Sequence, residues 1–582
     1  MRTGRFVYNE TDLAIGGDAG GGGLALTRTM SQSVDGHGNP FANLSHNWDI
    51  MITEQRIDFD NPAHSGAGYP DYQINVHFGG RSQTYRGRGN VTGFEQSSGG
   101  PYAPLTYAGD RTSAAVIYTY SAADGTVAVF RPLGGGDCSG PTYRRCAFVA
   151  QITEADGTIL SFDYTPSGSS GGEGGAQRPR RVTSSRGYAL LLEGSGTHVT
   201  KACVLNLTLA PVPADNLCPA NAPASASYGY TAGAPRLASA TGPDNAASTF
   251  TYGSSVNTMG FVRPGETSPW LTNTLGQVTD EEWVAQDIVT QQSFADGQSY
   301  SYNYGMSPVV DNGRPQTLAG GFYVDALGHR TDVPYAWPLL ATPGNPGSSC
   351  YPNICPQSQP DDYLHYVYQQ TPGPVSITDP LGRTTSLDYC DPIPMQQLPP
   401  DEGNRCAVVP LVSFTDPEGA RTELQYDDHR NISRVTRHAR PGSTQPNGQP
   451  WPDIVTSALF DTTHPRSSSK PLSMTDARGN TTDYSYAPEH GGLLTETGPA
   501  PGEGAPRPQT RHIYAQRTAW IANGAGGYVA AGPPIWVRTA TSSCRTSAAT
   551  GNAASPCALA GDEVRTTAPM PAPTLCCCAA RR

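Results

Sequence analysis

Residues 378–389 read TDPLGRTTSLDY, and residues 415–426 repeat the pattern as TDPEGARTELQY. In both stretches an Asp and a Pro precede a Gly, and a Tyr lies seven positions after that Gly. This order of Asp, Pro and Gly is typical of a type I turn that ends with a left-handed residue. Such turns connect antiparallel strands, and the Thr, Leu and Tyr residues that follow have high strand propensity. Each stretch therefore predicts a β-hairpin unit.

The same spacing recurs in seven units. Their turn residues and tyrosines are Gly157 and Tyr164, Asn245 and Tyr252, Gly297 and Tyr304, Gly328 and Tyr335, Gly382 and Tyr389, Gly419 and Tyr426, and Gly479 and Tyr486. Asn245 fits because Asn is the non-glycine residue that best tolerates a left-handed backbone. The turn positions are unevenly spaced, whereas a solenoid with equal rungs requires a fixed period. The pattern favours strand pairs interrupted by variable loops, which we expect around 341–361 and 439–452.

Two side chains of the unit invite a functional interpretation. We interpret Asp379, Asp416 and Asp476 as turn formers, because a calcium loop needs acidic residues at every second position. The tyrosine is expected to pack its ring on the sheet with its hydroxyl at the edge.

The composition agrees with many short strands. The 582 residues include 66 Gly, 52 Pro, 29 Tyr and 14 Phe, and disordered chains are poor in such aromatics. A net charge of −12 argues against a nucleic-acid surface. No apolar run approaches the ~20 residues of a membrane helix, and residues 1–8 do not read as a signal peptide.

The 13 cysteines include five pairs that are close in sequence. These candidate disulfides are Cys138 with Cys146, Cys203 with Cys218, Cys350 with Cys355, Cys390 with Cys406, and Cys544 with Cys557. Local pairs that bracket loops favour disulfides, and disulfides persist in oxidising compartments. A zinc site lacks the required spacing, because no CxxC faces a second pair. Unpaired buried thiols remain the alternative.

The units resemble the YD repeats of RHS (rearrangement hot spot) proteins. Three N-terminal stretches are also similar to the region before the repeats in that family: ETDLAIGG at 10–17, LALTRTM at 24–30 and SHNWD at 45–49. The resemblance covers roughly residues 5–567. It implies strands that wind into a hollow β-cocoon around a C-terminal toxin or effector segment. It carries over no catalytic residue, and neither the family's self-cleavage core nor a toxin domain is visible.

Two common motifs for catalysis are missing from the sequence. HExxH and Walker-type phosphate loops do not occur. The Gly-rich stretch 16–21 lacks the helix that a phosphate cradle needs, and the Ser467-x-x-Lys470 triplet lies in a Ser-rich loop. We therefore expect no enzyme activity, cofactor or metal site.

The last residues depart from the repeat. Residues 568–582 read APMPAPTLCCCAARR, and three adjacent cysteines fit no easy disulfide geometry. Two lysines against 36 arginines indicate GC-rich codons. If the codons of residues 576–580 are TGC-TGC-TGC-GCG-GC- and a C precedes them, the same bases read one position earlier encode Leu-Leu-Leu-Arg-Gly. We hypothesise a frameshift near codon 568; a disordered cysteine tail is the alternative.

These observations predict an all-β fold, an open or partial β-cocoon with an N-terminal β-rich region. The expected parts are that region at 1–130, YD-repeat sheet with loop insertions at 131–567 and the aberrant tail at 568–582. The predicted function is a structural shell or carrier of an exported RHS-type toxin or cell-surface system, in a truncated fragment without its effector. Its partner would be that absent C-terminal segment. The alternative is a cell-surface adhesin that binds glycans or proteins. We expect no nucleic-acid partner, no membrane span and an extracellular or cell-surface location.

Overall fold

The computed structural model describes most of the chain. The described residues are 7–16, 23–31, 44–56, 71–78, 81–88, 94–96, 102–110, 113, 115–133, 145–164, 178–194, 198–232, 236–253, 258–279, 284–306, 310–311, 314–315, 318–334, 374–389, 410–505, 507–544 and 563–565. Within them every helix or strand element is a β-strand, so the prediction of an all-β fold is confirmed. It follows that no helix in these ranges could cross a bilayer.

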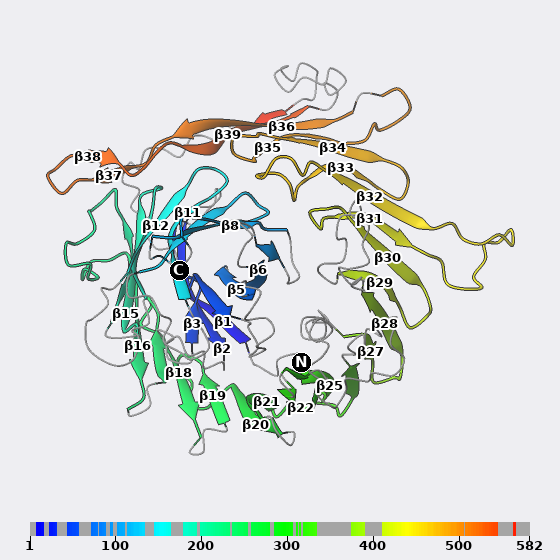
Figure 1. Ribbon diagram of the computed structural model, residues 1–582, viewed down its shortest axis with the longest axis horizontal. Coiled ribbons are helices and arrows are strands. Elements are labelled where there is room, and N and C mark those ends of the chain that lie inside the picture. Colours follow the sequence, from blue (N-terminus) through cyan, green and yellow to red (C-terminus); the bar gives the residue numbers. More distant parts are fainter. Residues whose placement is uncertain are drawn as a thin grey trace, which may run out of the picture.

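A small sheet at the N-terminus stands apart from the rest. It consists of β1 (Val7–Ile15), β2 (Leu24–Ser31) and β3 (Leu44–His46), paired antiparallel in that order. Figure 1 shows these strands inside the molecule, with most of the remaining strands arranged around them. We call β1–β3 the N-terminal sheet.

The remaining large sheet, which we call the shell sheet, is antiparallel throughout. Its first part contains β4 (Met51–Arg56), β5 (Asp71–Phe78), β6 (Arg81–Arg88), β7 (Glu95–Gln96), β8 (Leu105–Ala108), β9 (Ile117–Ser121), β10 (Val127–Arg131), β11 (Arg145–Thr153), β12 (Ile159–Tyr164), β13 (Pro179–Ser184), β14 (Tyr188–Glu193), β15 (Lys201–Asn206), β16 (Ala224–Tyr230), β17 (Leu237–Thr241), β18 (Ala247–Tyr252), β19 (Thr258–Val262) and β20 (Leu271–Thr279). Its second part contains β21 (Val284–Phe294), β22 (Ser299–Met306), β25 (Leu318–Val324), β26 (Arg330–Pro334), β27 (Ser376–Thr378), β28 (Thr384–Tyr389), β29 (Leu411–Thr415), β30 (Arg421–Tyr426), β31 (Ile432–Arg437), β32 (Ile454–Phe460), β33 (Pro471–Thr475), β34 (Thr481–Tyr486), β35 (Leu493–Thr497), β36 (Gln509–Arg517), β39 (Ile535–Cys544) and β40 (Glu563–Arg565). Two short hairpins form separate two-stranded sheets: β23 (Val310–Asp311) with β24 (Arg314–Pro315), and β37 (Trp520–Ala522) with β38 (Tyr528–Ala530).

The strands of the shell sheet pair mostly with their neighbours in sequence. The ladder branches at β11, which pairs with β4 through Arg145–Phe148 and with β12 through Gln151–Thr153. It is continuous at residue 130, because β10 pairs with both β9 and β11. Among the described strands no ladder joins β39 or β40 back to β7 or β8, so the sheet stays open, as predicted.

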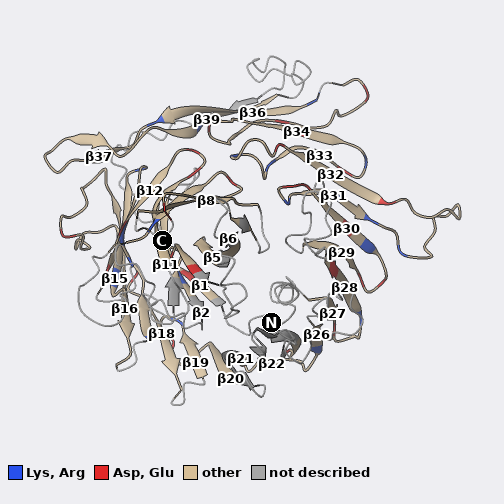
Figure 2. Cartoon of the chain, in the orientation of Figure 1, with Lys and Arg blue, Asp and Glu red and all other residues tan. Residues whose placement is uncertain are grey.

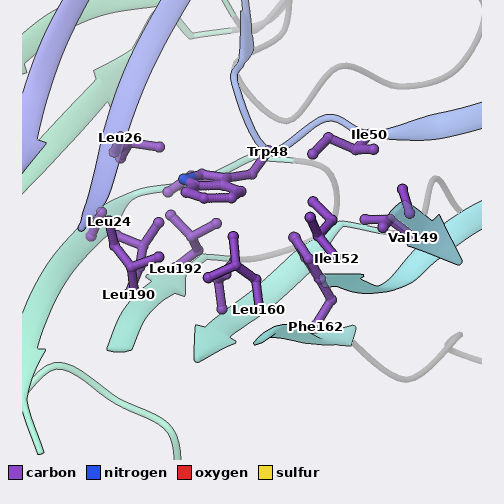
Figure 3. Packing of buried hydrophobic residues seen from close by; sticks show 14 of the residues in the cluster. Leu24, Leu26, Trp48, Ile50, Val149, Ile152, Leu160, Phe162, Leu190 and Leu192 are labelled. Atoms are coloured by element: carbon purple, nitrogen blue, oxygen red, sulfur yellow. The ribbon is translucent and has the colours of Figure 1, made fainter. Parts of the chain in front are cut away.

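The main apolar core lies between the N-terminal sheet and the first part of the shell sheet. β1 and β2 contact β14, β15 and β16. In Figure 3 the ring of Trp48 faces Leu160 and Leu190, and its Nε1 donates a hydrogen bond to the Ala25 carbonyl at 2.8 Å. Such burial contributes roughly 1.5–3 kcal/mol for each large apolar side chain. The N-terminal sheet therefore fills the space inside these strands.

Candidate functional site

The repeated turn has one backbone hydrogen-bond pattern, and at Asp379 the aspartate side chain adds to it. The amide of Gly382 donates to the Asp379 carbonyl at 2.9 Å, and the amides of Leu381 and Arg383 donate to Asp379 Oδ1 at 2.9 Å. Gly382 has a φ of 76°, which suits Gly because a Cβ would strain this backbone. The turn residues of all seven units, Asn245 included, have positive φ.

The carboxylates of these turns serve the turn itself. Hydrogen bonds from the Arg383 side chain and backbone hold the pKa of Asp379 below its ordinary value. The amide of Asn480 does the same for Asp476. Groups of three or more metal-ligating side chains do not occur in the described ranges. The carboxylates thus act as local turn acceptors.

The repeat tyrosine ties the two strands of each unit together. In six units its hydroxyl donates to a backbone carbonyl 15 residues upstream, over 2.7–3.1 Å. The donor–acceptor pairs are Tyr164–Val149, Tyr252–Leu237, Tyr304–Val289, Tyr389–Pro374, Tyr426–Leu411 and Tyr486–Pro471. Tyr335 lies outside the described residues. Burial raises the pKa of Tyr164 and of Tyr304, so both hydroxyls remain proton donors.

One disulfide is complete in the described residues. Cys203 and Cys218 are bonded, with their Cα atoms 5.8 Å apart. Cys146 and Cys544 are each disulfide-bonded as well. The remaining candidates, Cys138, Cys350, Cys355, Cys390, Cys406 and Cys557, lie outside the described residues, as do the tail at 568–582 and the loop at 341–361.

The pairing of the strands shows which residues lie on the same face of the shell sheet. Residues directly opposite each other on paired strands share a face, and so do alternate residues of one strand. One face passes from Phe162 in β12 through Leu190, Phe250, Tyr302, Leu387, Leu424, Met474 and Tyr484 to His512 in β36. Phe162, Leu190 and Phe250 belong to the core beneath the N-terminal sheet. We therefore call this face the inner face of the shell sheet.

The inner face changes character along the chain. From β12 to β20 its side chains are buried against the N-terminal sheet. Further along, Ile377 is 37% exposed and Met474 is 48% exposed, and Thr456 is also exposed. The later strands thus present an inner surface that is open to solvent.

A buried ion cluster fastens the N-terminal sheet inside the shell sheet. Arg28 is bound by Glu10 and Asp12, each at 2.6 Å. Tyr228, on the inner face of β16, donates its hydroxyl to Asp12 at 2.8 Å. The Arg28 guanidinium also lies over the ring of Phe250, 5.6 Å from its centroid. The carboxylates raise the pKa of Arg28 against the opposing effect of its burial, so the charge is retained.

The two ends of the shell sheet meet along what we call the seam. Turns of the first strands contact loops of β30–β39 there, and two of the hydrogen-bonded pairs lie 334 and 346 positions apart. In order along the seam the contacts are Arg430 Nη2 to Gln96 O at 3.4 Å, Tyr102 N to His429 O at 3.4 Å, Ser469 Oγ to Ala123 O at 2.7 Å, Trp536 N to Asp156 O at 2.8 Å and Ala522 N to Leu207 O at 2.8 Å. Figure 1 shows β36 and β39 running close to β11 and β12. The chain therefore winds once round and contacts its own start.

A pocket of about 380 Å³ opens at the end of the inner face. Its lining includes Glu489, His490, His512, Tyr514 and Trp536. The His490 ring lies 4.4 Å from the Tyr514 ring and 4.7 Å from the Trp536 ring, measured between centroids. Burial lowers the pKa of His490 and of His512, which keeps both imidazoles neutral at pH 7. Aromatic faces with a few polar groups are the usual lining of a small-molecule pocket.

Two features were not predicted from the sequence, a further turn at Asp427 and the pocket at His490. Asp427 forms the same turn as Asp379, but its left-handed residue is Arg430, with a φ of 65°. The missed signal is the Asp itself, followed four residues later by Asn431, whose side chain bonds it as Asn480 bonds Asp476. The pocket could not be found because its residues come from three separate segments.

The fold and the inner face define a wound β-sheet shell. The chain aligns with the crystal structure of TcdB2-TccC3 without its hypervariable C-terminal region at 13% identity and a TM-score of 0.26, over 84% of this chain and 22% of that chain. The TcdB2-TccC3-Cdc42 structure aligns at 11% identity and a TM-score of 0.25, over 90% of this chain and 31% of that chain. The N-terminal domain of the effector protein SpvB from Salmonella typhimurium strain LT2 aligns at 9% identity and a TM-score of 0.22, over 51% of this chain and 99% of that chain. These TM-scores are too low to establish a shared overall arrangement. No protein-family model and no curated protein sequence matches the chain.

Proposed function

We propose that the chain is the shell or carrier part of an exported RHS-type system, with its inner face turned toward a polypeptide cargo. The observation that carries the proposal is the change along the inner face. The N-terminal sheet fills the face from β12 to β20, whereas Ile377, Thr456 and Met474 remain exposed beyond it. The bonded cysteines support export, because disulfides persist in oxidising compartments.

The role is structural and requires no catalytic residue, cofactor or nucleic acid. The turn carboxylates and repeat tyrosines are used within the hairpins that contain them. Figure 2 shows basic and acidic residues interspersed along the described strands. A broad hydrolase panel is expected to show no turnover.

Neighbouring residues of β32 provide a direct test of whether the shell shields its inner face from large molecules. Thr456 lies on the inner face opposite Val435, and Ser457 lies on the outer face opposite Arg434. Each is replaced by Cys in a chain whose residues Cys576, Cys577 and Cys578 are changed to Ser. A small maleimide should label both positions, while a 5-kDa polyethylene-glycol maleimide should label Ser457→Cys much faster than Thr456→Cys. Equal labelling by the large reagent, or no labelling of position 456 by the small one, would overturn the proposal.

A second candidate function is carbohydrate binding, and the pocket at His490 favours it. Tyr514 and Trp536 offer aromatic faces, and Glu489 with two neutral imidazoles offers hydrogen-bonding groups. If this is the function, the chain should be retained on a glycan array. Trp536→Ala should abolish retention, whereas Trp520→Ala, a change at an exposed tryptophan outside the pocket, should not. Retention that survives Trp536→Ala would exclude the pocket as the binding site.

A further inference from the structure

A second, smaller apolar cluster lies on the outer face of the shell sheet. β14 and β15 each have four consecutive buried residues, so both of their faces are covered. Leu190 and Val204 face the main core, while Leu191 and Cys203 face outward. The outward-facing cluster consists of Ala189, Leu191, Cys203, Leu205, Leu207 and Cys218. It must be covered by something outside the sheet.

The segment after β15 provides part of this cover. It runs from Leu207 to Ala222, and Val212 and Ala222 pack against the outer cluster. The disulfide joins Cys203, in the middle of β15, to Cys218 across 15 positions of sequence. Asn216 accepts a hydrogen bond from Arg181 at 2.9 Å, and the amide of Cys218 donates to Glu193. A crosslink of this loop length contributes about 3 kcal/mol in the chain-entropy view, so the segment depends on it to stay in place.

The β37–β38 hairpin provides the rest of the cover from the other end of the chain. Ile521 packs against the outer cluster, and the amide of Ala522 donates to the Leu207 carbonyl at 2.8 Å. A Cβ on Gly187 would lie 3.4 Å from the Ile521 side chain, so the hairpin sits directly on the β13–β14 turn. These contacts form the last part of the seam.

We propose that the Cys203–Cys218 disulfide and the β37–β38 hairpin form a redox-sensitive latch on the outside of the seam. A dithiol reductant attacks the disulfide, the S–S bond breaks and two thiols form. The reductant gives up two electrons and two protons and becomes a disulfide itself. The segment 208–222 is then released from β15, and Ile521 loses part of the surface on which it docks. In an oxidising compartment the latch is shut; in a reducing one it opens.

The coupling works in both directions, because linkage between two sites is reciprocal. Cys203 is 0% exposed and Cys218 is 9% exposed. Ile521 packs against the outer cluster to which both cysteines belong. Removing the hairpin contact should therefore make the disulfide easier to reduce, just as removing the disulfide should loosen the hairpin.

The first arm of the test measures the hairpin. Amide hydrogen exchange is followed by mass spectrometry in the oxidised full chain and in the Cys203→Ala/Cys218→Ala variant. Exchange in 519–531 should rise about tenfold, within the range of typical couplings, while exchange in 464–470, at another seam contact, stays unchanged. Unchanged exchange in 519–531 would overturn the latch.

The second arm measures the disulfide and leaves it intact at the start. Ile521→Asp should speed the reduction of Cys203–Cys218 by dithiothreitol about tenfold. The rate is measured by alkylating the freed thiols and mapping the peptides. Tyr528→Ser is the matched control, since Tyr528 is 59% exposed on the same hairpin. Equal reduction rates in Ile521→Asp and the parent chain would contradict the proposal. The latch requires no cargo, so its test is independent of the shell function.

Discussion

Turns with the same backbone hydrogen bonds occupy different surroundings in two regions of the molecule. In the first strands, Gly125 and Gly157 lie in turns that touch the seam, and a Cβ on Gly125 would come within 2.8 Å of Arg466 Cα. In the later repeats, a Cβ on Gly297 or Gly382 would meet nothing within 4 Å. The sequence pattern therefore makes the turn, while its position in the winding decides whether the turn is buried.

The strand faces of the two regions differ in the same way. Leu190 in β14 is 0% exposed beneath the N-terminal sheet, whereas Leu424, on the same inner face in β30, is only half-buried. The first region is stabilised by packing on its faces. The later repeats depend more on their ladders, turns and tyrosine hydrogen bonds.

The largest effect is expected from truncating the inner face in each region. Leu190→Ala leaves a cavity in the closed core and should lower the free energy of unfolding by about 2–5 kcal/mol. Leu424→Ala should cost about 1 kcal/mol, because solvent already reaches the site. Urea unfolding, with hydrogen exchange to assign the region, measures both. Equal losses would show that the later inner face is packed as tightly as the first.

A smaller difference is expected from the turn glycines. Gly125→Ala and Gly297→Ala both place a side chain at positive φ, 88° and 85°, which costs about 1 kcal/mol. Only Gly125→Ala also pushes against the Arg466 backbone. Its urea midpoint should therefore fall further, and the backbone amides of 464–470 should exchange faster. If both variants behave alike, the contact at Arg466 does not hold the seam.

The smallest difference is expected from the repeat tyrosines. Tyr164→Phe removes a buried hydroxyl from the Val149 carbonyl and should cost about 1–3 kcal/mol, since that acceptor is left without its donor. Tyr426→Phe should cost about 0.5–1 kcal/mol, because water can replace the hydroxyl at the Leu411 carbonyl. Thermal unfolding of both variants compares them. A larger loss for Tyr426→Phe would reverse the comparison.

The local units could be predicted from the amino-acid sequence alone. Asp379, Pro380 and Gly382 specify the turn through short-range sterics and hydrogen bonds, and the alternation that follows specifies the strand. Local cysteine spacing likewise pointed to the pair Cys203 and Cys218. Turns and local crosslinks depend on residues a few positions apart, so they can be read from one sequence.

Only the tertiary structure decided how the units are arranged. The Arg28 cluster beneath Tyr228, the seam between Asp156 and Trp536, and the docking of Ile521 on the outer cluster join residues far apart in the chain. Such contacts depend on the accumulated twist of many strands and on which loops meet after one full winding. No local sequence pattern predicts which loops meet at the seam. Each strand depends on its sequence neighbours, whereas the seam depends on the accumulated twist of all the strands between its two sides.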